Sequence, residues 1–171
     1  MRKPISIRSF FKIASPRWFA QGMALSLVIF ALDATSKWWL ISEFDIAAVS
    51  PLEITPFFDL VMVWNPGISF GLLHAGSFAQ TVMLIIAATL LVLVLLVWLA
   101  RSDGQINSLA LGLVIGGAAG NIIDRAINGA VADFFSLHVA GFHWPAFNVS
   151  DMAISVGVVI LLVQSFRSPA H

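Results

Sequence analysis

The stretch from Gly117 to Asp151, GAAGNIIDRAINGAVADFFSLHVAGFHWPAFNVSD, decides how the rest of the chain is interpreted. It carries Asp124, Arg125, Asp133 and Asp151 in a protein that is 59% hydrophobic and has a mean hydropathy of +0.94. Ionisable groups at membrane depth are costly and are by default candidates for a functional site. We therefore interpret the remaining sequence as a scaffold that holds these groups at one end of a membrane-embedded bundle.

The composition indicates a single membrane domain, residues 1–171. Only 11% of the residues are charged, whereas a soluble domain carries about 25%, so polar surface is too scarce to coat a water-exposed globule. The net charge is zero and no basic run is interleaved with aromatic residues, which argues against nucleic acid as a partner.

Metal binding is not expected from the residue types present. The chain has no cysteine and therefore no disulfide and no thiolate site. Its histidines, His74, His138, His143 and His171, form no H-x-x-x-H pair, and a zinc site needs about three clustered N, O or S ligands. We therefore predict that the protein holds no metal.

Four segments are apolar enough to span a bilayer, at residues 19–42, 78–100, 106–125 and 146–166. The second contains no charged residue, and at 1.5 Å per residue it crosses a hydrocarbon core of about 30 Å. The first follows a basic run, as in a signal peptide, but it is too long and lacks a small-x-small cleavage site, so we expect it to be retained. The third contains Gly112, Gly116 and Gly120, a repeated G-x-x-x-G pattern that permits close helix packing.

The basic residues predict the orientation, because Lys and Arg mark the cytoplasmic side. Most of them lie at the termini or in the turn at 101–105: Arg2, Lys3, Arg8, Lys12, Arg17, Arg101 and Arg167. We therefore expect both termini to be cytoplasmic. The tryptophans agree with this arrangement, since Trp38, Trp39, Trp64 and Trp144 then fall at outer ends of the spans.

The segments 43–77 and 128–145 are then extracytoplasmic. Glu53 to Trp64 contains β-branched and aromatic residues interrupted by Pro56, which predicts a short strand or two. VADFFSLHV, at 131–139, is also expected to be partly extended. The predicted fold class is an integral membrane, mainly α protein, with four transmembrane helices and a small extracytoplasmic β-containing platform.

Polar side chains from all four spans are expected at one depth, near the outer interface. They are Asp33, Lys37, Asn65, Asn121, Asp124, Arg125, Asn148 and Asp151. Several independent spans that deliver polar groups to the same level are hard to explain as lipid anchoring. This convergence predicts a site.

The acids differ in their neighbours. Asp33 and Lys37 are i,i+4, and Asp124 is adjacent to Arg125, so a structural ion pair is the simpler interpretation of each. Asp133 and Asp151 have no basic residue within four positions. Either alone can be a solvated carboxylate, but as a pair on elements that return to the same face they suit acid and base chemistry.

Two adjacent carboxylates share a proton, so that one serves as a general base and the other as a general acid. Water held between them can attack a peptide carbonyl, as in aspartic peptidases. A proton-coupled transporter can use buried acids as a relay, and a non-enzymatic membrane assembly subunit needs no chemistry from them. The residues alone leave the choice between an enzyme and a transporter open.

The motifs, in their order, resemble those of the bacterial lipoprotein signal peptidases, the signal peptidase II family. They are D-A-T-S-K (33–37), N-P-G-I-S-F-G (65–71), G-G-A-A-G-N-I-I-D-R (116–125), V-A-D-F (131–134) and F-N-V-S-D (147–151). The resemblance implies that Asp133 and Asp151 are the catalytic dyad. It also implies that the following residues line or support the active site: Asp33, Lys37, Asn65, Gly67, Phe70, Asn121, Asp124, Arg125 and Asn148.

The same resemblance implies an aspartic peptidase of the bacterial inner membrane that needs no cofactor. The expected substrate is a prolipoprotein whose cysteine carries diacylglycerol, cut just before that cysteine to release the signal peptide, with membrane lipids as the surroundings. Two residues depart from the family pattern, since Ser69 and Ser150 stand where alanine is commoner. Both changes are small in volume and leave the expected chemistry intact.

Overall fold

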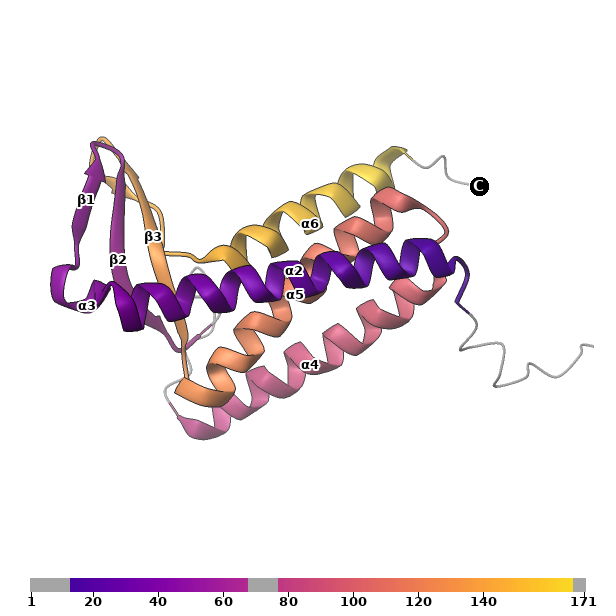
Figure 1. The fold of residues 1–171 in the computed structure, drawn as a ribbon, viewed down its shortest axis with the longest axis horizontal. Coiled ribbons are helices and arrows are strands. Elements are labelled where there is room, and N and C mark those ends of the chain that lie inside the picture. Colours follow the sequence, from indigo (N-terminus) through magenta and orange to yellow (C-terminus); the bar gives the residue numbers. More distant parts are fainter. Residues whose placement is uncertain (1–12, 68–76, 168–171) are drawn as a thin grey trace, which may run out of the picture.

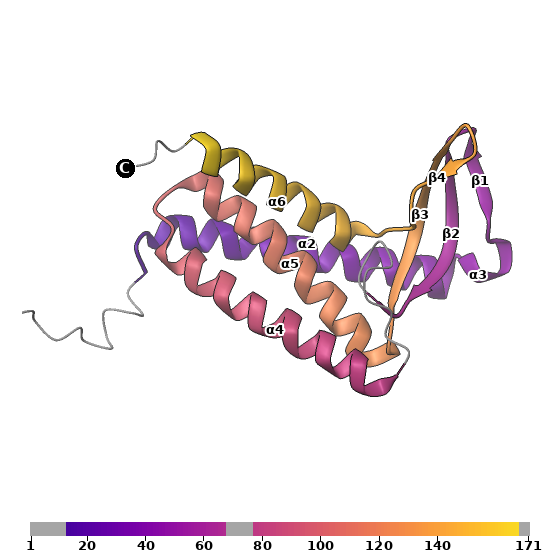
Figure 2. The ribbon, with the colours of Figure 1, turned by 180° about the vertical axis from the view of Figure 1, so that it is seen from behind.

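The computed structural model describes residues 13–67 and 77–167, and the fold is a bundle of four long helices with an antiparallel sheet at one end (Figures 1 and 2). The described chain ends, at residues 13 and 167, both lie at the end of the bundle opposite the sheet. Four helices are long and apolar enough to cross a membrane. The predicted fold class, four membrane helices with a small β-containing platform, is confirmed.

The first helix, α2 (Pro16–Trp38), continues as the π-helical segment η1 (Trp39–Glu43). The other long helices are α4 (Phe78–Arg101), α5 (Gln105–Asn128) and α6 (Val149–Arg167). Helix α6 therefore begins later than the predicted residue 146. The reason is that Phe147 pairs with β3, its N–H donating to the carbonyl of Phe135 at 3.0 Å, so the backbone there is extended.

Helix α5 lies at the centre of the bundle, between α2, α4 and α6 (Figures 1 and 2). Its glycines make this possible, because a Cβ at Gly116 would lie 2.5 Å from the carbonyl oxygen of Ser26 in α2. A Cβ at Gly112 would likewise collide with the backbone of Gly22. The close packing predicted from the G-x-x-x-G pattern is confirmed.

Gly112→Ala is expected to lower the melting temperature of the purified protein in detergent. Alanine favours a helix, but the added methyl group meets the Gly22 backbone, and overpacking costs about 1–3 kcal/mol. Gly104→Ala is the matched control, because a Cβ at Gly104 meets nothing within 4 Å. A Gly112→Ala protein that melts at or above the temperature of Gly104→Ala contradicts the packing argument.

The sheet has the order β1-β2-β3-β4, with β1 (Leu52–Thr55), β2 (Phe58–Asn65), β3 (Val131–Val139) and β4 (Phe142–His143). The strands predicted in 53–64 and 131–139 are confirmed, whereas β4 and the short helix α3 (Ile46–Val49) were not predicted. Phe134 and Ala132 of β3 pack against Leu40 and Ile46 in a buried cluster. This cluster fixes the sheet on the end of α2.

Candidate active site

Asp133 lies on the face of β3 opposite the buried cluster. Successive side chains of a strand point to opposite faces, and Ala132 and Phe134 occupy the face that packs on Leu40. Asp133 is only 1% exposed. A carboxyl group is thus held in the interior, next to the entry of α6.

Asn65 holds one side of this carboxyl group. As the last residue of β2, it lies beside β3, and its Nδ2 donates to Asp133 Oδ2 at 3.0 Å. Its Oδ1 accepts from the N–H of Gly67 at 3.1 Å. The amide is therefore fixed at both ends, which orients Asp133.

Asn148 connects the two candidate catalytic acids. Its Oδ1 accepts from the backbone N–H of Asp151 at 2.9 Å, as a helix N-cap does. Its Nδ2 donates to Asp133 Oδ1 at 2.7 Å and to the carbonyl of Ala132 at 3.3 Å. One buried amide thereby fixes the start of α6 against the strand that carries Asp133.

Asp151 lies in the first turn of α6, where the helix dipole favours a negative charge. Its Oδ1 accepts from Asn121 Nδ2 at 2.9 Å. Asn121 lies on α5, so Asp151 is positioned by a helix other than its own. Asp133 and Asp151 therefore come together from β3 and α6, each held by asparagines.

The ion pair predicted between Asp124 and Arg125 is wrong. Adjacent residues of a helix point about 100° apart, and Asp124 Oδ2 instead lies 2.7 Å from Lys37 Nζ. Arg125 donates through Nη1 to the carbonyl of Asn121 at 3.3 Å and through Nη2 to the carbonyl of Gly67. Arg125 thus ties α5 to the segment that follows β2.

Lys37 is the centre of a second network. Its Nζ lies 2.6 Å from Asp33 Oδ2 and 2.7 Å from Asp124 Oδ2, so the predicted pair between Asp33 and Lys37 is confirmed. Asp33 Oδ1 also accepts from the N–H of Ser150 at 2.9 Å, and Asp124 Oδ2 accepts from that of Ala132 at 3.3 Å. The network joins α2, α5, α6 and β3 directly behind the dyad.

The electrostatic environment raises the pKa of Asp133 to about 7. Burial is the largest cause, because it disfavours the charged form, and the nearby charge of Asp151 acts in the same direction. Hydrogen bonds from Asn65 and Asn148 and the charge of Lys37 partly oppose the shift. Near neutral pH a proton is therefore available on Asp133.

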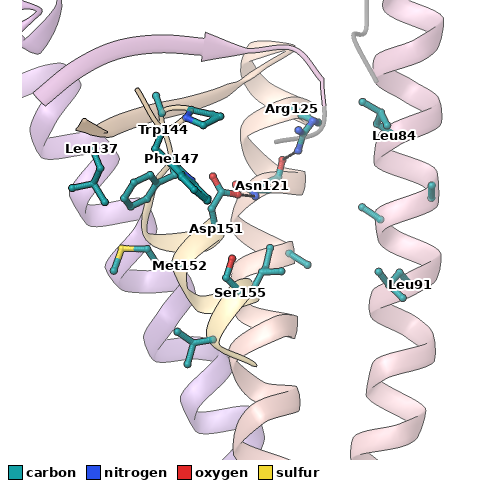
Figure 3. Close-up of a pocket in the computed structure, with 17 residues that line it drawn as sticks. Leu84, Leu91, Asn121, Arg125, Leu137, Trp144, Phe147, Asp151, Met152 and Ser155 are labelled. Carbon is teal, nitrogen blue, oxygen red and sulfur yellow. Dashed lines mark hydrogen bonds between the residues drawn. The ribbon is translucent and has the colours of Figure 1, made fainter. Parts of the chain in front are cut away.

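Asp151 lies at the polar end of an apolar groove with a volume of about 960 Å³ (Figure 3). Leu84 and Leu91 of α4 form one wall, and Met152 and Ser155 of α6 form the opposite wall (Figure 3). Asp151 lies among the lining residues. The groove runs from a polar end formed by Asn121, Arg125 and Asp151 into surfaces of α4 and α6 whose apolar side chains are largely exposed.

Two buried polar atoms beside the groove have no partner within the described part of the chain. They are Asn121 Oδ1 and Arg125 Nε, and both residues line the groove. One is an acceptor and the other a donor. Buried polar groups are normally hydrogen-bonded, so this pair is suited to the main chain of a bound peptide.

The structure brings the predicted site residues into two adjoining networks, one around the dyad and one around Lys37, while Phe70 lies outside the described residues. The sequence analysis missed the groove wall formed by α4 and the lining residues Leu137 and Phe147. A signal for that wall was Ala87 and Ala88, two adjacent small residues near the middle of a largely bulky apolar helix.

Two carboxyl groups held between a strand and a membrane helix, beside an apolar groove along the bundle, define a class of protein: a membrane-embedded protein with a candidate site that contains two acids. The family profile described as signal peptidase (SPase) II matches residues 25–167. The chain belongs to the signal peptidase II family.

Individual relatives agree with this assignment. The lipoprotein signal peptidase of Beijerinckia indica is 45% identical over 155 residues, which cover 90% of this chain and 91% of the relative. That of Nitrobacter hamburgensis is also 45% identical, with 87% and 94% covered. A solved structure described as a bacterial membrane enzyme, determined by the in meso method at 2.3 Å, has a TM-score of 0.75 at 22% identity, with 86% and 88% of the two chains covered; it supports the fold.

Proposed function

We propose that the chain is an aspartic endopeptidase that removes the signal peptide from diacylglyceryl-modified prolipoproteins by cutting before the lipidated cysteine. The relatives named lipoprotein signal peptidases support the substrate class. The observation that carries the proposal is the link made by Asn148, which binds the Asp133 carboxyl group and the backbone of Asp151 at once. This link ties the Asp133 carboxyl group to the start of the helix whose Asp151 lines the groove.

In the proposed reaction the two acids begin with different protonation. Asp133 holds the proton, in keeping with its raised pKa, and Asp151 is the base. Asp151 takes a proton from water, the resulting hydroxide attacks the scissile carbonyl carbon, and Asp133 protonates the carbonyl oxygen. Collapse of the gem-diol intermediate breaks the C–N bond: the proton held by Asp151 passes to the leaving amine, and the Asp133 carboxylate takes a proton from one hydroxyl group of the gem-diol. The products are a carboxylic acid and an amine, and both acids return to their starting protonation.

The substrate fits the groove by its chemistry. A signal peptide is an apolar helix in the bilayer, and its acyl-bearing end can remain in lipid while the peptide bond reaches the dyad. Asn121 Oδ1 and Arg125 Nε then bind the peptide main chain. The remaining predicted residues, Asp33, Lys37 and Asp124, support the dyad from behind.

We also infer that both termini are cytoplasmic and that the site lies near the extracytoplasmic face of the inner membrane. Arg17, Arg101 and Arg167 support this orientation, because they lie at the ends of α2, α4 and α6 away from the sheet (Figure 1). Lys and Arg are enriched on the cytoplasmic side. The sheet and the dyad then face outward.

A gel-shift assay with purified protein tests the function. A diacylglyceryl-modified prolipoprotein is expected to lose its signal peptide, whereas the same precursor with the acceptor cysteine changed to serine, which cannot be lipidated, is expected to stay intact. Cleavage of both precursors contradicts the proposed substrate class. Absence of cleavage together with proton flux in reconstituted vesicles favours the transporter interpretation instead.

Asn65→Ala is expected to move the alkaline limb of the kcat/KM profile to higher pH. Asn65 donates to the Asp133 carboxylate and so lowers its pKa, and loss of this bond lets the pKa rise above about 7. The protonated acid then persists at higher pH. Asn128→Ala, at the exposed end of α5, is the control, and a limb that moves to lower pH in Asn65→Ala contradicts the assignment.

A further inference from the structure

The outer end of the sheet carries a cluster of exposed apolar side chains that extends beyond the groove. This cluster, here named the apolar tip, consists of Phe57, Leu137, Val139, Phe142 and Trp144, which are 42% to 68% exposed. Together with His138 they line a shallow pocket of about 190 Å³. A contiguous exposed apolar patch usually marks an interaction site.

The part of the apolar tip that β3 and β4 supply lies on the face of the sheet that carries Asp133. Asp133, Leu137 and Val139 are separated by even numbers of residues in β3 and so point to the same face. Val139 pairs with Phe142 across the hairpin, and the Phe142 and Trp144 rings contact each other at a centroid distance of 6.4 Å. The apolar tip is therefore the outer part of the same sheet face that carries the candidate active site.

At the outer end of the sheet, the opposite face is polar. Ser136 and His138 alternate with the apolar residues of β3, Ser136 pairs with Asp59, and His138 pairs with His143. His138 Nε2 lies 3.2 Å from Asp59 Oδ2, and the two histidine rings stack at 5.0 Å. The end of the sheet is thus amphipathic, with one apolar face and one charged and polar face.

The position of the tip shows what the apolar face meets. The strands run crosswise to the helices, and the end with the β1–β2 and β3–β4 turns projects sideways past α6 (Figures 1 and 2). Leu137 and Trp144 belong both to the tip and to the groove, whose wall includes Met152 of α6. Helix α6 itself exposes apolar side chains, among them Val156 and Val159, which are 51% and 58% exposed.

We propose that the apolar tip rests on the bilayer and inserts its side chains into the interfacial region of the leaflet on the sheet side. An element with one apolar face and one polar face lies in the plane of that interface, and Trp and Phe suit its mixed chemistry. The tip is continuous with the lipid-facing surface of α6, so lipid occupies it. This inference needs only the membrane-spanning bundle and is independent of the proposed reaction.

The test uses an environment-sensitive fluorophore at single cysteines, which the cysteine-free chain accepts without background. Phe142→Cys carries the probe on the tip, and Glu53→Cys, exposed on β1 on the polar face, is the matched control. Val159→Cys on α6 is the positive control for lipid. The full-length protein is reconstituted in phosphatidylethanolamine and phosphatidylglycerol vesicles that contain shallow or deep spin-labelled lipids.

The probe at position 142 is expected to emit at shorter wavelength than the probe at 53 and to be quenched by shallow spin labels, because interfacial elements lie about 5–10 Å deep. The probe at 159 is expected to be quenched by the deep labels. Equal emission and quenching at 142 and 53 overturn the proposal. Quenching at position 142 that appears only after prolipoprotein is added would show that the tip binds the substrate. Disulfide-linked dimers through position 142 would show that the tip binds a second copy of the chain. Either result also overturns the proposal.

Discussion

Asp133→Asn and Asp151→Asn are each expected to lower prolipoprotein cleavage by about 10²–10⁴-fold, the range that positioned acids and bases contribute. Each amide keeps the shape of the side chain but can neither hold the catalytic proton nor accept one from water. Because the two acids act as a unit, the double variant is expected to be little worse than either single variant. A gel-shift time course measures these rates.

Asp59→Asn is the matched control for this pair. Asp59 lies on β2 of the same sheet, and its carboxylate lies 3.2 Å from His138, on the face opposite the dyad. Cleavage by Asp59→Asn is expected to match the wild type. Normal cleavage by both dyad variants would show that the catalytic acids are elsewhere, with Asp124 the next candidate.

Stability provides a second readout for Asp133 that activity alone does not give. The folded pKa of about 7 lies above the ordinary value of 3.8. Between these values the unfolded state has lost the proton while the folded state keeps it, so the contribution of Asp133 to stability falls as pH rises. Asp133→Asn lacks this penalty and is expected to melt above the wild type at pH 8, with the difference shrinking towards pH 4.

Asp151→Asn is expected to behave differently. The carboxylate in the first turn of α6 interacts favourably with the helix dipole, typically by 0.3–1 kcal/mol, and asparagine loses that contribution. A small fall in melting temperature is therefore expected, opposite in sign to Asp133→Asn. If both variants shift the melting temperature in the same direction at pH 8, the unequal environments assigned to the two acids are wrong.

The spans and the convergence of polar groups could be predicted from the sequence because membrane burial leaves a strong signal. A long uncharged apolar run such as 78–100 is expected to lie in lipid. Ionisable residues within spans are expected to pair with one another. Spacing along a helix gave the pair of Asp33 and Lys37 in the same way. These features depend on local sequence and on one dominant free-energy contribution, the cost of placing polar groups in lipid.

Contacts between elements could not be predicted in the same way. Asp124 pairs with Lys37 of α2 and not with its neighbour Arg125, because the packing of α2 on α5 decides which cation reaches it. Asn148 acts both as a helix cap and as a ligand of Asp133. A sequence shows that Asn148 can cap a helix, but only the register of β3 shows which carboxyl group its amide meets.

The sequence analysis expected Trp144 at the outer interface but did not predict the rest of the apolar tip, for a related reason. Phe142 and Trp144 follow β3 after a short turn, in a stretch of sequence with no periodic pattern. Only the cross-strand pairing of Val139 with Phe142 places them on one face. The amphipathic character of the sheet end is therefore a property of the hairpin and not of either strand.

Lys37→Met is expected to give the largest loss of stability among single changes outside the dyad. Lys37 is 5% exposed and Asp33 is 1% exposed, and the ammonium group lies between Asp33 and Asp124. Its removal leaves two buried carboxylates without a cation, and breaking a buried pair costs about 3–5 kcal/mol. At roughly 2–4 °C per kcal/mol, the melting temperature in detergent is expected to fall on the order of 10 °C.

The triple variant Asp33→Asn, Lys37→Met, Asp124→Asn is the matched control, because it removes all three charges and keeps the side-chain oxygens. Asp33 Oδ1 accepts from Ser150 N–H and Asp124 Oδ2 accepts from Ala132 N–H, and an asparagine oxygen can accept from either. The triple variant is expected to recover most of the stability lost in Lys37→Met. If it melts as low as the single variant, the loss comes from packing around the lysine stem and not from unpaired charge.

Lys37→Met is also expected to act on the dyad through its charge. The Lys37 charge lowers the pKa of Asp133, against the larger effect of burial, so its loss raises that pKa further. The alkaline limb of kcat/KM is then expected to move to higher pH in the residual activity of Lys37→Met, in the same direction as in Asn65→Ala. If the protein is destabilised but the alkaline limb does not move, Lys37 has only a structural role between the helices. A purely structural lysine changes the amount of folded enzyme without changing the titration of Asp133.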